Sequence, residues 1–167
     1  MMNKKIQSYL PLFSLVFSLL LLFMAFLNAL SVDGEPIMNG IKAIFGGNIA
    51  SVGDFASADV TFSLLNFIAF FLPAVLSIAI AIYGVKNQKP NAIKLILGLL
   101  VAISFVLSVV LISTLPTNTK ALISIFGGET SFTYEGAALG IGAVLGLIFA
   151  ILGSVTSILY SVLQLQK

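Results

Sequence analysis

Four long stretches without a charged residue constrain this sequence more than any other feature. They cover residues 10–30, 60–85, 95–115 and 136–166, the last with an apolar core at 137–162. Each matches or exceeds the roughly 20 residues with which an α-helix crosses about 30 Å of hydrocarbon. The pattern predicts an all-α membrane protein, a single transmembrane domain over residues 1–167 built as a four-transmembrane-helix bundle.

The composition also indicates that lipid surrounds much of the chain. Apolar residues make up 59% of the chain and charged residues 8%, against about 45–50% and about 25% in soluble domains. So few charges cannot cover the surface of a soluble domain, so the lipid bilayer is the expected partner. A net charge of +2 does not indicate a nucleic-acid partner. Because every basic residue is lysine, we expect an AT-rich genome, such as that of a low-GC bacterium.

The lysines predict how the chain is oriented. Six of them fall on one side of the predicted membrane: Lys4, Lys5, Lys86, Lys89, Lys94 and Lys167. The other side holds Lys42, Lys120 and all the acidic residues: Asp33, Glu35, Asp54, Asp59, Glu129 and Glu135. Lysine-rich loops stay in the cytoplasm. We therefore expect a multi-pass protein of the plasma membrane, with both termini and the loop 86–94 cytoplasmic and the loops 32–59 and 116–136 outside.

A cleaved signal peptide is the alternative interpretation of the first stretch, with residues 1–5 as its basic region. The apolar run is longer than the 7–15 residues typical of such a peptide. Leu27 would also occupy a position before the cleavage site that requires a small residue. Both points favour a retained helix.

An internal repeat divides the chain into halves at about 6–85 and 93–163. Residues 41–47 (IKAIFGG) match residues 122–128 (LISIFGG). Both halves begin on the same side, so the repeat predicts two parallel helical hairpins. Apolar residues at helical spacing predict a short amphipathic helix in each outer loop. The candidates for an outer cap are Phe45, Gly46, Gly47, Phe126, Gly127 and Gly128. They act either as helix stops with an aromatic anchor or as a paired cap that contacts a partner.

Polar side chains within the predicted spans are few, and none is charged. Asn28 and Asn66 lie at similar depths, so we expect either a hydrogen bond between them across the first hairpin or a contact with a solute. Pro73 should kink the second span, because it removes a backbone hydrogen bond.

Small residues recur every three or four positions in the last span. They are Gly142, Gly146, Ala150, Gly153 and Ser157, with a shorter set, Gly98 and Ala102, in the third span. Such stripes let helices approach closely in lipid. They serve either packing inside the bundle or contact with another protomer.

No residue pattern indicates catalysis. Cysteine and histidine are absent, so no catalytic residue, metal ligand or cofactor is expected. The leading hypothesis is a non-catalytic tetraspan, an accessory or scaffold subunit that associates with another membrane protein or with itself. The alternative is a small channel or transporter for ions or small solutes.

Overall fold

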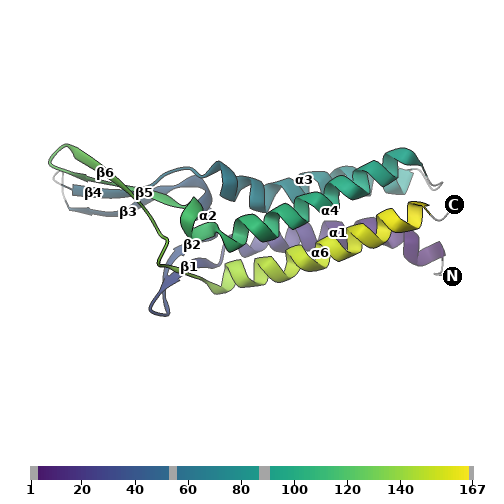
Figure 1. The fold of residues 1–167 in the computed structure, drawn as a ribbon, viewed down its shortest axis with the longest axis horizontal. Helices are drawn as coiled ribbons and strands as arrows, with labels where there is room; N and C mark the ends of the chain where they lie inside the picture. Colours follow the sequence, from purple (N-terminus) through teal and green to yellow (C-terminus); the bar gives the residue numbers. More distant parts are fainter. Residues whose placement is uncertain (1–3, 53–55, 87–90, 166–167) are drawn as a thin grey trace.

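Four long helices lie side by side and form the body of the molecule in the computed structural model (Figure 1). They are α1 (Lys4–Met24), α3 (Leu64–Lys86), α4 (Ala92–Ser113) and α6 (Ile141–Leu165). The structure describes residues 4–52, 56–86 and 91–165, so Asp54, Lys89 and Lys167 lie outside the described residues. Helices α1 and α4 each pack against both α3 and α6. The start of α1 and the end of α6 lie at the same end of the body.

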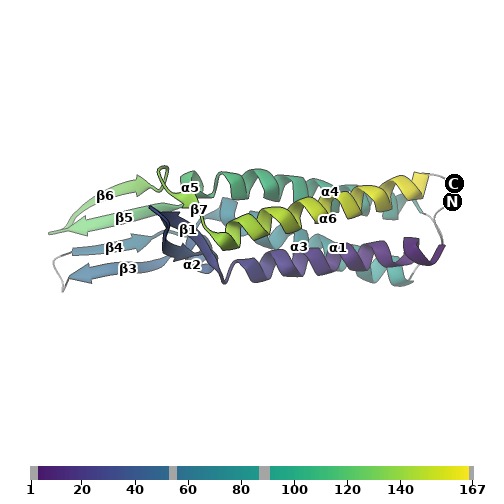
Figure 2. The same ribbon diagram turned by 90° about the horizontal axis from the view of Figure 1, so that it is seen from below.

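Two antiparallel sheets lie at the opposite end (Figure 2). The smaller sheet has the order β2-β1-β7 and contains β1 (Asn28–Val32), β2 (Glu35–Asn39) and β7 (Ala138–Leu139). The larger has the order β3-β4-β5-β6 and contains β3 (Gly47–Val52), β4 (Ala56–Val60), β5 (Lys120–Ile125) and β6 (Gly128–Thr133). Of the two short helices, α2 (Gly40–Phe45) links β2 of the smaller sheet to β3 of the larger, and α5 (Leu115–Asn118) links α4 to β5.

The prediction of an all-α four-helix bundle is therefore wrong, because the chain is mixed α and β. Three helices, in α3, α4 and α6, are long and apolar enough to cross a membrane, which indicates membrane association. The described apolar stretch of α1, Tyr9–Met24, is shorter. The apolar run that predicted a longer first helix does not stay helical. Helix α1 ends at Met24, and Asn28 begins a strand whose Ala29 and Leu30 are buried.

The outer loops also differ from the prediction of two amphipathic helices in equivalent positions. The first forms as α2, which begins where the Asn39 side chain accepts a hydrogen bond from the backbone N–H of Lys42. In the second, the matching residues form strand β5 instead. The segments that join the long helices therefore differ between the two halves, and the repeat itself stays a prediction.

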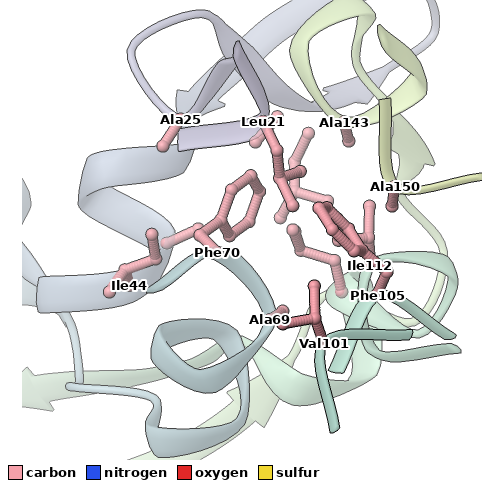
Figure 3. Close-up of a cluster of buried hydrophobic side chains, with 14 of the residues drawn as sticks. Leu21, Ala25, Ile44, Ala69, Phe70, Val101, Phe105, Ile112, Ala143 and Ala150 are labelled. Carbon is pink, nitrogen blue, oxygen red and sulfur yellow. The ribbon is translucent and has the colours of Figure 1, made fainter. Parts of the chain in front are cut away.

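The centre of the body is filled with side chains from all four long helices (Figure 3). Leu21 of α1, Phe70 of α3 and Phe105 of α4 are fully buried. Ala150 of α6 is buried against them. Pro73 lies inside α3, which continues through it from Leu64 to Lys86. The kink expected at this proline stays a prediction.

Candidate interaction surface

The larger sheet has one apolar and one polar face. Residues that pair across antiparallel strands point to the same side, and alternate residues point to opposite sides. From the register, the apolar face consists of Ala50, Val52, Ala56, Ala58, Val60, Ala121, Ile123, Ile125 and Phe132, with Gly47, Gly128 and Thr130 between them. The described part of this face carries no charge.

The opposite face of the same sheet is polar. It consists of Asn48, Ser51, Ser57, Asp59, Lys120, Leu122, Ser124, Glu129, Ser131 and Thr133. The Asn48 side chain donates a hydrogen bond to the Asp59 carboxylate at 3.0 Å. Lys42 donates to the Asn48 backbone carbonyl at 2.8 Å. At the base of this face, Asn48 thus links Asp59 of β4 to Lys42 of α2.

Beyond the base of the sheet, the two faces are exposed to a similar degree. Ile123 and Ser124 are neighbours on β5 that point to opposite faces, and both are half-buried. Ala58 and Ser57 on β4 form a second such pair. Val52 is 70% exposed and Ile125 is 53% exposed at the free end of the sheet. The apolar face therefore meets solvent, and only its base, at Val60 and Ala121, joins the buried core.

The free end of the sheet is formed by a two-residue turn at Phe126 and Gly127. Both residues have positive φ, 49° and 81°, and the strands they join pair at Ile125 and Gly128. This is the pattern of a type I′ hairpin, which favours Asn, Asp or Gly in both positions. The ring of Phe126 is 82% exposed. An aromatic residue thus occupies the tip in a backbone conformation that suits it poorly.

The two Phe-Gly-Gly motifs are not brought together as a paired cap. Phe45 ends α2 at the base of the sheet, whereas Phe126 lies at the far tip (Figure 2). The Phe45 ring packs on Phe67 and Phe71, with ring centroids 6.1 and 5.9 Å apart. A side chain on Gly46 would overlap the Val60 carbonyl oxygen, so only glycine fits there. The first motif is a helix stop with an aromatic anchor, and the second is a hairpin turn.

The small residues of α4 and α6 all face their own chain. Gly142, Gly146, Ala150, Gly153, Ser157, Gly98 and Ala102 are buried. A Cβ on Gly142 would lie 2.7 Å from the Met24 carbonyl oxygen, and one on Gly153 would overlap the Phe105 ring. The Ser157 hydroxyl lies 3.0 Å from that of Ser14 on α1. These residues leave no exposed surface for a second protomer.

The side chain of Asn66 connects the two segments that link the long helices, at the end of the body next to the sheets. Its side-chain amide donates to the Ala43 carbonyl at 2.9 Å and to the Thr119 hydroxyl at 3.0 Å, and it is fully buried. Asn28 lies in β1, where its backbone faces Gly140. The amide of Asn66 thus bonds to α2 and to Thr119, the residue between α5 and β5, instead of to Asn28, and contact with a solute stays untested.

Comparisons with protein-family profiles, curated proteins and solved structures find no match to this chain. Among the described residues, no three acidic, histidine or cysteine side chains are placed to hold a metal ion. The geometry of the chain itself is therefore the basis for assigning a function.

Sequence reasoning missed the apolar face, although part of its signal is present. Residues 56–60 (ASADV) and 121–125 (ALISI) place apolar side chains at every second position, the period of a half-buried strand. The Asp33-Gly34 pair is also a hairpin signal, and it forms the turn between β1 and β2. Both signals are short compared with the apolar runs beside them.

Proposed function

We propose that this chain is a non-catalytic membrane protein, an accessory or scaffold subunit that binds another protein through a sheet held outside the lipid. The observation that carries the proposal is the uncovered apolar face of the larger sheet. Contiguous exposed apolar area marks interaction sites in folded proteins. The strands run roughly along the helix axes, so this face stands upright from the membrane (Figure 1).

The distribution of charge supports a plasma-membrane location with both chain ends in the cytoplasm. Lys4, Lys5, Lys86 and Lys94 belong to helix ends on the side of the molecule opposite the sheets. Asp33, Glu35, Asp59, Glu129 and Glu135 belong to the end with the sheets or to the segments beside them. Lys42 and Lys120 also lie at that end, so the excess of lysine at the opposite end supports, by the positive-inside rule, an outer position for the sheets.

The packed body favours a binding role over a channel or transporter. A path through one protomer would have to displace Leu21, Phe70 and Phe105, which fill the centre of the body. Among the described residues, the buried charged side chain is Lys94, which lies in the first turn of α4 and far along the helix from Phe105 at this centre. Coupled transport and voltage sensing use such groups, so their absence from the centre offers these activities no support.

Site-specific photo-cross-linking in native membranes tests the proposal. A photoreactive residue at Ile123 reports on the apolar face, and one at Ser124 is the matched control on the polar face, since both positions are half-buried. We expect covalent protein adducts at position 123 and few at position 124. Equal or absent adducts at both positions would contradict a role for the apolar face in binding.

A flux measurement tests the alternative function, a channel or transporter. The purified chain reconstituted in liposomes should pass ions and small solutes no faster than protein-free liposomes. Saturable or selective flux would overturn the scaffold assignment in favour of a channel or transporter.

A further inference from the structure

We infer that the outer edge of strand β6 binds an extended segment of a partner protein, which adds a further strand to the larger sheet. The inference rests on the proposed binding role of this sheet and names the chemistry of its partner. An edge strand presents a row of backbone N–H and C=O groups that another extended chain can pair with. Among the described residues, the edges of the two sheets are formed by β2, β7, β3 and β6.

Three of these edges carry features that hinder pairing with another chain. Strand β2 contains Pro36, and its pairing with β1 is irregular. Strand β7 is only two residues long. Strand β3 has a shift in register between Asn48 and Ala50, and the Asn48 carbonyl already accepts a hydrogen bond from the Lys42 side chain. Prolines, bulges, lysines and short strands are the means by which edge strands avoid pairing.

Strand β6 has none of these features. It forms the border of the larger sheet (Figure 2). Its residues, from Gly128 to Thr133, pair one by one with β5 without a shift in register. They include no proline and no lysine, and all but Thr133 are exposed. Strand β6 is thus a regular strand whose outer side meets no other described strand.

The hairpin turn determines which backbone groups of β6 point outward. In a two-residue hairpin the residues that flank the turn, here Ile125 and Gly128, form a hydrogen-bonded pair. Hydrogen-bonded and non-hydrogen-bonded pairs alternate along antiparallel strands. Glu129, Ser131 and Thr133 therefore turn their N–H and C=O groups away from β5. These donors and acceptors have the spacing that an antiparallel partner strand requires.

The two faces of β6 define the side chains that the partner segment should carry. Thr130 and Phe132 lie on the apolar face, whereas Glu129 and Ser131 lie on the polar face. A partner strand continues both faces, so it should alternate apolar and polar residues. Glu129 is the charged residue of β6, and opposite charges on facing residues stabilise a strand pair. The residue that faces Glu129 should therefore be lysine or arginine.

A synthetic peptide that carries a fluorophore tests the inference. It alternates threonine and valine and ends in lysine, so that antiparallel pairing brings the lysine opposite Glu129. The control peptide has the same side chains but carries N-methyl groups on the threonine and lysine amides, which would donate to β6. Fluorescence anisotropy with the full chain in detergent measures binding. We expect saturable binding of the first peptide and at least about tenfold weaker binding of the second, because its hydrogen bonds to β6 are lost.

Variants of the chain check the edge and the charge separately. Ser131→Pro removes an outward N–H and should weaken binding several-fold, whereas Ser131→Ala removes only the hydroxyl and should not. Because an edge strand tolerates proline where the N–H faces solvent, both variants should melt at the same temperature. Glu129→Lys should weaken binding of the lysine peptide several-fold and strengthen binding of a peptide with glutamate in its place. This charge exchange tests the same edge without a change in the backbone.

Three results would overturn the inference: no saturable binding, equal binding of the two peptides, or a charge exchange without effect. A dimer of the chain in detergent that Ser131→Pro dissociates would also overturn it, because the edge would then bind a second copy. If the peptide does not bind while photo-cross-linking at Ile123 captures another membrane protein, the partner uses the apolar face and the proposed binding role stands. If both assays are negative, the proposed role fails as well.

Discussion

The φ angle of Phe126 makes this residue the clearest case of local strain in the described chain. Left-handed backbone costs an ordinary L-residue roughly 1–2 kcal/mol, and here the residue is an exposed phenylalanine at φ 49°. The equivalent position of the β1–β2 hairpin holds Asp33, at φ 52°, and aspartate tolerates this region.

Replacing Phe126 with asparagine should therefore stabilise the fold. We expect Phe126→Asn to raise the free energy of unfolding by about 1 kcal/mol, or the melting temperature by about 2–4 °C. Asp33→Phe is the reciprocal control and should lower both by a similar amount. Circular dichroism during heating in detergent measures the two variants. A lower melting temperature for Phe126→Asn would show that the ring makes contacts worth more than the strain.

Asn66 supports a second prediction at the residue scale. Asn66→Leu removes both donors and leaves the Ala43 carbonyl unpaired in a buried site, so we expect a loss of about 1–3 kcal/mol in stability. Thr119→Val removes one of the two bonds and should cost less. Thermal unfolding in detergent compares them. Unchanged melting of Asn66→Leu would contradict a structural role for the amide.

Among the elements, α6 depends on glycine in a position-specific way. A Cβ at Gly142 would meet backbone atoms of Met24 and Asn28 at 2.7 and 2.9 Å, which cannot move separately from their chain. At Gly146 the nearest atom is the Leu21 Cδ1, at 3.3 Å, the end of a flexible side chain. Gly142→Ala should therefore destabilise by about 1–3 kcal/mol, as overpacked cores do.

The matched variant Gly146→Ala should cost less than Gly142→Ala, because a leucine side chain can rotate and alanine is the better helix former. Chemical or thermal unfolding of both variants in the same detergent measures the difference. Equal losses would show that helix α6 can shift away from α1 as a unit.

The long helices could be predicted from the sequence because each rests on one continuous local signal. The uncharged runs at 60–85, 95–115 and 137–162 correspond to α3, α4 and α6 to within a few residues. The first run misled, because apolar character does not distinguish a helix from the buried strand at Ala29 and Leu30. An apolar run predicts that its residues avoid water, but it does not predict whether they form a helix or a strand.

The sheet could not be assembled from the sequence in the same way. Strand β4 pairs with β5, and the two lie in different halves of the chain. The two Phe-Gly-Gly segments also have the same sequence but different local structures. Asn39 caps the short helix that ends at Phe45. Before Phe126 the chain forms strand β5, and Phe126 and Gly127 are the turn that joins it to β6. Residues outside the motif decide its structure.

For the whole molecule, the orientation proposed above is a prediction that rests on where the lysines and the sheets lie. The helix ends with Lys86 and Lys94 lie opposite the end with the sheets. If the positive-inside rule sets the orientation, the sheet is outside and the start of α4 is in the cytoplasm. Single cysteines separate these sides, since the natural chain contributes no thiol.

Ser51→Cys on β3 and Ala92→Cys at the start of α4 are the matched pair, because both positions are exposed and lie at opposite ends of the molecule. A membrane-impermeant maleimide applied to intact cells should label Ser51→Cys at once. It should label Ala92→Cys only after the membrane is permeabilised. The reverse pattern would place the sheet in the cytoplasm, where the binding partner would then have to be sought. Labelling of both positions in intact cells would mean that the chain inserts in two orientations, as expected if too few lysines bias its insertion.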